Sequence, residues 1–145
     1  MTHITRSALV MHTAHEMYSL VIDVARYPDF LPWCSGAEVL DESPESQIAS
    51  VSLSMAGVKQ RFTTRNELEQ GRTVRMELVE GPFSQLKGEW KFTPLGDSGC
   101  KVALDVRFEF SNSLVAATTN PVFSKICTSL VEAFCQRADD FYGKS

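Results

Sequence analysis

Apolar and polar residues alternate with a period of two through most of the middle of this chain. Each such run puts apolar side chains on one face of a strand and polar or charged side chains on the other. One run begins near residue 36, and the best defined ones cover residues 49–55, 61–68, 74–80, 86–92 and 101–110. Short segments containing glycine or proline separate the runs, which predicts strands joined as an antiparallel meander.

The N-terminal part of the chain shows the pattern of a helix. After a β-prone run from Ile4 to Met11, the segment Thr13–Glu16 fits a capping box, in which a Thr hydroxyl and a Glu carboxylate satisfy free N–H groups. Apolar residues then recur at helical spacing at Met17, Leu20, Val21 and Val24. We expect this helix to end before Pro28, because the residue ahead of a proline avoids the helical region. A short helical turn is expected near Asp29 to Leu31.

The C-terminal part carries a long amphipathic stripe from Val122 to Tyr142. Ser111 or Asn112 can cap the helix that leads into it, Pro121 predicts a kink or a restart, and Gly143 ends it. The predicted order is strand, two helices, six strands and one helix, within a single domain of residues 1–145. One helix has to cover the apolar face of the sheet. This predicts an α+β fold with a curved antiparallel sheet wrapped around the C-terminal helix.

Composition and charge narrow the class of protein. The chain has 145 residues, 43% of them hydrophobic and 22% charged, which is typical of one globular domain. Its apolar runs are too short for a membrane-spanning helix and its start lacks a signal-like stretch, so we expect a cytoplasmic protein. The formal net charge of −4 is opposite in sign to that of most nucleic-acid binders and argues against DNA binding. The outward strand face mixes both signs of charge, as a solvated surface does.

Catalytic and metal-binding motifs do not stand out. The four cysteines form no C-x-x-C pair, and without an export signal we expect no disulfides, with Cys127 and Cys135 as buried hydrophobic residues. His12 and His15 have a spacing found in metal sites, but a helix start at Thr13 places them on opposite sides, so we expect no metal. The sequence contains no phosphate-binding loop and no G-x-S-x-G or H-E-x-x-H motif. We therefore expect a non-enzymatic protein.

A curved sheet and a single helix leave a gap that side chains or a ligand must fill. Apolar residues facing this gap are candidates for the wall of a ligand cavity, with an ordinary packed core as the alternative. Thr64 and Asn66 share the inward face with Phe62 and Leu68. They would orient an oxygen atom of the ligand, unless the strand register is shifted or that end of the sheet is wet. The candidate wall comprises Val51, Leu53, Phe62, Thr64, Asn66, Met76, Phe83, Trp90, Phe108, Phe123, Ile126 and Leu130.

Large apolar side chains also lie on two predicted loops. Residues 27–34 read Tyr-Pro-Asp-Phe-Leu-Pro-Trp-Cys, and Phe83 directly follows Gly81-Pro82. Exposed apolar side chains on loops mark a cavity mouth or a membrane contact. The alternative is that the two loops pack on each other. The candidate mouth residues are Tyr27, Phe30, Leu31 and Trp33.

These segments resemble the coenzyme Q-binding START-like proteins, part of the polyketide cyclase/dehydrase-like group. The resemblance rests on Tyr27–Cys34 together with Gly81–Phe83 and Leu86–Phe92, and matches from Ser7–Val10 to Pro121–Phe123 extend it over essentially the whole chain. It implies a helix-grip fold with a deep apolar cavity, no metal and no covalent cofactor. It also implies ubiquinone or a related isoprenoid lipid as the bound ligand. Peripheral contact with the inner membrane would accompany loading of such a lipid.

The same resemblance leaves alternatives open. Bacterial members of the group are also described as ribosome-association toxins, which implies an inhibitor of ribosomal subunit association that contacts the large ribosomal subunit. The net charge of −4 argues mildly against direct contact with ribosomal RNA. A small-molecule cyclase or dehydrase is a third reading, but it needs an acid or base in the cavity, and no Asp, Glu or His falls clearly on the inward face. The sequence therefore favours a non-enzymatic quinone carrier or chaperone that supports respiratory electron transport.

Overall fold

Seven strands and three helical segments are described by the computed structural model, which covers residues 1–143. Their order confirms the predicted strand, two helical segments, six strands and final helix, and so confirms the α+β fold. The elements are β1 (Thr2–Val10), α1 (Ala14–Ile22), η1 (Val24–Asp29), β2 (Cys34–Ser43), β3 (Ser46–Met55), β4 (Val58–Glu69), β5 (Thr73–Glu80), β6 (Phe83–Leu95), β7 (Gly99–Phe110) and α2 (Ser113–Tyr142).

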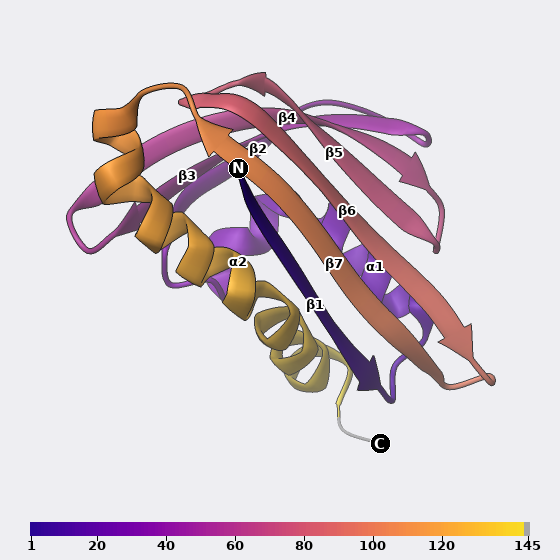
Figure 1. The fold of residues 1–145 in the computed structure, drawn as a ribbon. Helices are drawn as coiled ribbons and strands as arrows, with labels where there is room; N and C mark the ends of the chain where they lie inside the picture. The colour runs from indigo at the N-terminus through magenta and orange to yellow at the C-terminus, as the bar shows by residue number, and fades with distance from the viewer. Residues whose placement is uncertain (144–145) are drawn as a thin grey trace.

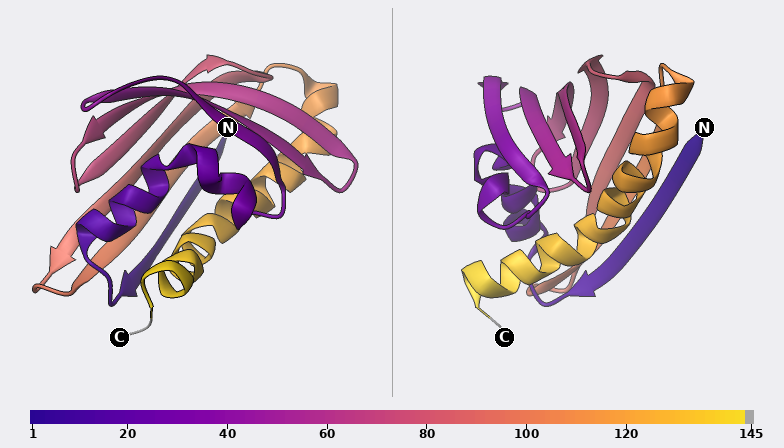
Figure 2. Two further views of the ribbon diagram at one scale, coloured as in Figure 1. Left: turned by 180° about the vertical axis from the view of Figure 1, so that it is seen from behind. Right: turned by 90° about the vertical axis from the view of Figure 1, so that its left-hand side faces the viewer.

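Neighbouring strands of the sheet all run antiparallel, in the order β1-β7-β6-β5-β4-β3-β2. From β2 to β7 each strand pairs with the next in the chain, whereas β1 joins the other end of the sheet through β7. Figure 1 shows the curved sheet with α2 running diagonally along its concave side. Figure 2 shows α1 and the short 3-10 segment η1 on the same side, so the helices together cover the buried face of the sheet.

The first helix begins as predicted but ends earlier. The capping box is confirmed: Glu16 N donates to Thr13 Oγ1 at 3.1 Å, and Thr13 N donates to Glu16 Oε1 at 2.8 Å. α1 then ends at Ile22, and η1 follows with Pro28 inside it, so the turn lies earlier than the predicted Asp29 to Leu31. A short 3-10 segment tolerates proline because few of its N–H groups have backbone partners.

The last helix begins at the predicted cap, Asn112, and ends at the predicted Gly143. It begins directly after Asn112, whose Oδ1 accepts a hydrogen bond from Leu114 N at 2.7 Å, and it runs for 30 residues. It continues through Pro121, where the sequence left a kink or a restart open. Pro121 and Ala117 are both exposed, so water can hydrate the Ala117 carbonyl that the proline deprives of its N–H partner.

Aromatic rings fill the space between α2 and the sheet in two groups. Ring centroids lie 4.6 to 6.3 Å apart in the first group, which comprises Phe62, Phe83, Phe108, Phe110 and Phe123. They lie 5.2 to 6.2 Å apart in the second, which comprises Tyr27, Phe30, Trp90 and Phe134. α2 contributes one ring to each group, Phe123 and Phe134, so these two rings anchor the helix to the sheet at two points.

The anchoring role of Phe123 gives a stability prediction. Its side chain is 5% exposed and contacts four other rings. Phe123→Ala should lower the free energy of unfolding by about 3–5 kcal/mol, because it leaves a cavity in the aromatic group. Leu114→Ala on the same helix should change it by less than about 0.5 kcal/mol, because Leu114 is 80% exposed. Urea unfolding followed by circular dichroism measures both, and equal effects would contradict the anchoring.

Candidate functional site

An internal cavity of about 100 Å³ lies between the two aromatic groups. Its wall is formed by the inward faces of strands β3 to β7, by α2, and by residues of the segment between α1 and β2. Most of the predicted wall residues line it: Val51, Phe62, Thr64, Asn66, Met76, Trp90, Phe123, Ile126 and Leu130. The period-two pattern thus identified the inward face of the sheet correctly.

Three predicted wall residues lie outside the cavity. Leu53, Phe83 and Phe108 point inward, as predicted, but they are 2%, 6% and 0% exposed and belong to the packed core rather than to the wall. Phe83 and Phe108 pack against each other and against Phe123 in the first aromatic group. Periodicity gives the face of a strand but not the point along it where close packing gives way to open space.

Other lining residues were missed by the sequence analysis, although signals for some were present. Leu86 and Gly88 lie on the same face of β6 as Trp90, and Phe134 follows Leu130 by one helical turn. Gly88 makes room for the Met76 side chain, because a Cβ there would lie 2.5 Å from Met76 Cε. The missed residues are Val24, Ala49, Leu86, Gly88, Val106, Cys127 and Phe134.

A chain of buried hydrogen bonds forms the polar end of the cavity. Thr64 and Asn66 are 6% and 5% exposed, so the wet sheet end considered above is ruled out. Thr64 Oγ1 donates to Asn66 Oδ1 at 2.8 Å, and Asn66 Nδ2 donates to Gln47 Oε1 at 2.9 Å. Gln47, which the sequence analysis did not single out, is 1% exposed and donates through Nε2 to the Ile22 carbonyl at 2.8 Å. These hydrogen bonds link β3 and β4 to the end of α1.

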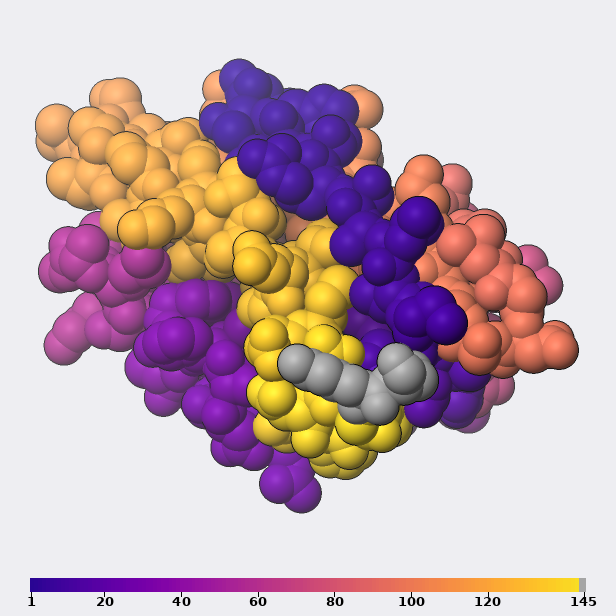
Figure 3. Space-filling model, turned by 90° about the horizontal axis from the view of Figure 1, so that it is seen from below, coloured from indigo at the N-terminus to yellow at the C-terminus, as the bar shows by residue number. Residues whose placement is uncertain are grey.

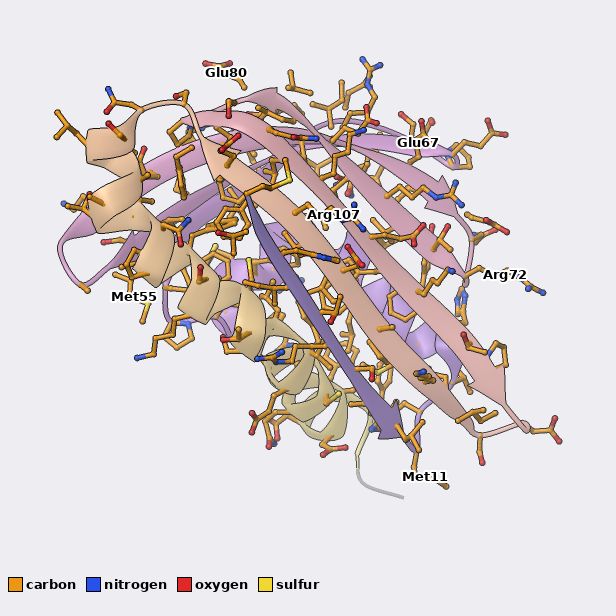
Figure 4. The ribbon with its side chains drawn as sticks, in the orientation of Figure 1. Met11, Met55, Glu67, Arg72, Glu80 and Arg107 are labelled. Carbon is orange, nitrogen blue, oxygen red and sulfur yellow. The ribbon has the colours of Figure 1, made fainter. Side chains whose placement is uncertain are left out.

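Trp33 and Ile126 separate the cavity from a surface groove. Both residues line the cavity, and both also line a groove of about 510 Å³ between α2 and residues 31–33. Figure 4 shows Met55, which lines the groove, beside α2. A second groove of about 690 Å³ lies on the opposite flank of α2, against β1, and Figure 3 shows α2 exposed beside that strand. Movement of Trp33 would therefore open the cavity to the first groove.

The other predicted mouth residues are less exposed than expected. Leu31 is 1% exposed and packs in a small cluster with Val24 and Cys34, so in this conformation it cannot contact a membrane. Phe30 is half-buried between Tyr27 and Phe134, with the Arg137 guanidinium 4.9 Å from its ring centroid. Tyr27 lines the cavity and donates its hydroxyl to the Val21 carbonyl. The rings of this loop thus pack onto the core in the second aromatic group, whereas Phe83 packs in the first, which differs from the alternative in which the two loops pack on each other.

The ionisable groups of the cavity are held in their neutral forms. Burial raises the pKa of the Cys127 thiol to about 12 and also raises the pKa of the Tyr27 hydroxyl. Neither a carboxylate nor an imidazole is among the lining residues. The cavity is therefore suited to apolar contact and hydrogen bonding rather than to proton transfer.

The two histidines that share a metal-like spacing lie apart from the cavity. His12 is 5% exposed, and its Nε2 lies 2.8 Å from Asp139 Oδ1, which ties the start of α1 to the end of α2. His15 lies close to Gly71 in the turn between β4 and β5. Within residues 1–143 no group of three His, Cys, Asp or Glu residues is placed to hold a metal ion. Over the same residues no helix is long and apolar enough to cross a membrane.

The outward face of the sheet carries most of the basic side chains of the chain. Arg107 pairs with Asp105, and Arg75 pairs with Glu89 at 2.9 Å. Within the described part of the chain no carboxylate lies within salt-bridge distance of three lysines on this face, Lys87, Lys91 and Lys101. Figure 4 shows Arg107 on β7 in the middle of this face and Glu67 near its rim.

Several known proteins are similar to this chain over nearly its whole length. The "Ribosome association toxin RatA" of Pseudomonas aeruginosa is 46% identical over 142 residues, which are 98% of this chain and 99% of that protein. The protein of the same name from Escherichia coli is 43% identical over 98% of this chain and 90% of its own length. A mitochondrial coenzyme Q-binding protein of Drosophila melanogaster is 30% identical over 91% of this chain and 56% of that protein.

Solved structures share the fold at lower sequence identity. An aromatase/cyclase from a Streptomyces species superposes with a TM-score of 0.80 at 19% identity, over 95% of this chain and 93% of that one. An 18 kDa protein from Caulobacter crescentus gives a TM-score of 0.76 at 24% identity, over 99% of both chains. Residues 10–135 match the family described as "Polyketide cyclase / dehydrase and lipid transport". With this match and the relatives above, the chain belongs to the polyketide cyclase/dehydrase and lipid transport family.

Proposed function

We propose that this protein acts through association with the ribosome. The observation that carries the proposal is the 46% identity, over 98% of the chain, to a protein named for ribosome association. The match therefore covers nearly all of the chain. The sequence analysis placed this reading second, behind quinone binding, and the relatives reverse that order because the coenzyme Q-binding relative is only 30% identical.

The outward face of the sheet is the surface that best suits a ribosomal partner. The chain has a net charge of −4, so contact with RNA requires basic side chains whose charge is not already paired with a carboxylate. Among the described residues, Lys87, Lys91 and Lys101 on the neighbouring strands β6 and β7 form no ion pair, although Glu77 and Glu89 lie beside them on the same face. We therefore propose that ribosomal RNA contacts this face, with the large subunit as the partner expected from the sequence.

Charge reversal on this face tests the proposal. Lys87→Glu/Lys91→Glu should lower the affinity for purified ribosomal particles by roughly an order of magnitude, measured by cosedimentation at fixed salt. Arg26→Glu/Lys125→Glu makes the same change in net charge at exposed positions on η1 and α2, on the other side of the sheet, and should bind nearly as well as the original chain. Equal losses in both variants would contradict the assignment of the face. Failure of the unchanged chain to cosediment would contradict ribosome association itself.

The internal cavity supports a second candidate function, the binding of an apolar ligand without catalysis. Its wall is apolar apart from one polar end, the pattern expected for a lipid with a small polar head group such as ubiquinone or a related isoprenoid. The volume of about 100 Å³ is well below the roughly 300–1,000 Å³ of common ligand sites. Binding of a whole lipid therefore requires Trp33 or α2 to move, whereas a single ring needs little rearrangement.

A cavity-filling substitution tests ligand binding. Gly88→Ala should reduce quinone binding severalfold, because its Cβ displaces the Met76 side chain and both residues line the cavity. Gly36→Ala is the matched control, since a Cβ there meets only Ser52, at 3.9 Å. Quenching of tryptophan fluorescence by added ubiquinone, with mass spectrometry of solvent extracts, measures occupancy. The absence of both saturable quenching and extracted quinone would count against this function.

A further inference from the structure

The direction of the buried hydrogen-bond chain is fixed from one end. This series of hydrogen bonds begins at the Ile22 carbonyl, and a carbonyl oxygen can only accept a hydrogen bond. Gln47 must therefore turn its Nε2 toward Ile22, which leaves Oε1 facing Asn66. Asn66 must in turn present Nδ2 to Gln47 and Oδ1 to Thr64, so the Thr64 hydroxyl has to donate.

This direction determines what the polar end offers to a ligand. The single hydrogen of Thr64 Oγ1 is used toward Asn66, so only its acceptor lone pairs remain. Asn66 Nδ2 carries two hydrogens, and one is used toward Gln47, so one donor remains. Both residues line the cavity. The polar end thus combines one acceptor and one donor on neighbouring inward positions of β4.

A ligand hydroxyl matches this pair, and a carbonyl oxygen does not. A hydroxyl donates to Thr64 Oγ1 and accepts from Asn66 Nδ2 at the same time, whereas a carbonyl oxygen can only accept. We infer that the cavity selects apolar ligands that carry a hydroxyl group over the corresponding ketones. Of a quinone and its hydroquinone, the hydroquinone is the preferred form. This inference rests on the ligand-binding function proposed above and adds the class of head group.

The size of the cavity indicates which probes to use. A protein cavity of about 150 Å³ holds benzene, so one of about 100 Å³ is close to accepting a six-membered ring. Cyclohexanol and cyclohexanone share that ring and differ at one oxygen, hydroxyl against ketone. They also avoid the reaction of quinones with thiols, which matters because Cys127 lines the cavity.

Titration of the ¹⁵N-labelled full chain with the two probes, followed by NMR chemical shifts, measures the ratio of their dissociation constants. Thr64→Val removes the acceptor at nearly constant shape. The preference for cyclohexanol over cyclohexanone should fall about tenfold in this variant, the value of one hydrogen bond. Thr64→Ser keeps the hydroxyl and should keep the preference. Because Thr64→Val also frees Asn66 Oδ1 as an acceptor, an unchanged ratio in this variant, together with no nuclear Overhauser contact between bound cyclohexanol and Thr64 in the unaltered chain, would overturn the inferred selectivity while leaving ligand binding intact.

Two further outcomes distinguish a failure of this inference from a failure of the ligand-binding function on which it rests. If neither probe shifts the resonances of cavity residues in the unaltered chain, ligand binding fails and the selectivity fails with it. If Thr64→Val does not fold, nuclear Overhauser contacts in the unaltered chain give the same answer. The carbinol proton of cyclohexanol should contact the Thr64 methyl group, and bound probe without that contact would overturn the inference.

Discussion

The whole structure depends on one packing constraint, the fit of a long helix against a curved sheet. Both surfaces are apolar where they face each other, and Figure 2 shows that α2 itself bends along the curved sheet. Phe123 and Phe134 enter the two aromatic groups, and the cavity is left between these contacts. The cavity is the space between those two anchors, and its position follows from the spacing of two phenylalanines along α2.

The polar chain at one end of the cavity shows how the fold tolerates buried amides. Asn66 and Gln47 would each cost free energy if they were left without partners away from water. In each of these amides the carbonyl oxygen accepts one hydrogen bond and the nitrogen donates one. The bonds therefore run without a gap from the Thr64 hydroxyl to the Ile22 carbonyl. The same bonds join the end of α1 to β3 and β4. Because the amides stabilise this junction, their presence alone does not indicate a ligand, and the proposed ligand site rests on the groups left over at Thr64 and Asn66.

Much of this arrangement could be predicted from residue patterns, and the limits of prediction have physical causes. The period of two placed Thr64 and Trp90 correctly on the inward face, and the Thr13–Glu16 capping box fixed the start of α1. The same period could not show that Phe108 packs tightly while Met76 borders open space. That difference depends on sheet curvature, a property of seven strands together. Gln47 was missed because its partner Ile22 lies 25 residues away in the chain, and no local pattern reports such a bond.

The two proposed functions use opposite faces of one sheet, which allows them to coexist. The lysines Lys87 and Lys91 project outward from β6, while Leu86, Gly88 and Trp90 of the same strand line the cavity. A ligand that enlarges the cavity has to displace residues of the inward face, and a strand can transmit that displacement to alternate residues on its outer side. β6 is therefore the element that connects the cavity to the surface proposed to contact the ribosome.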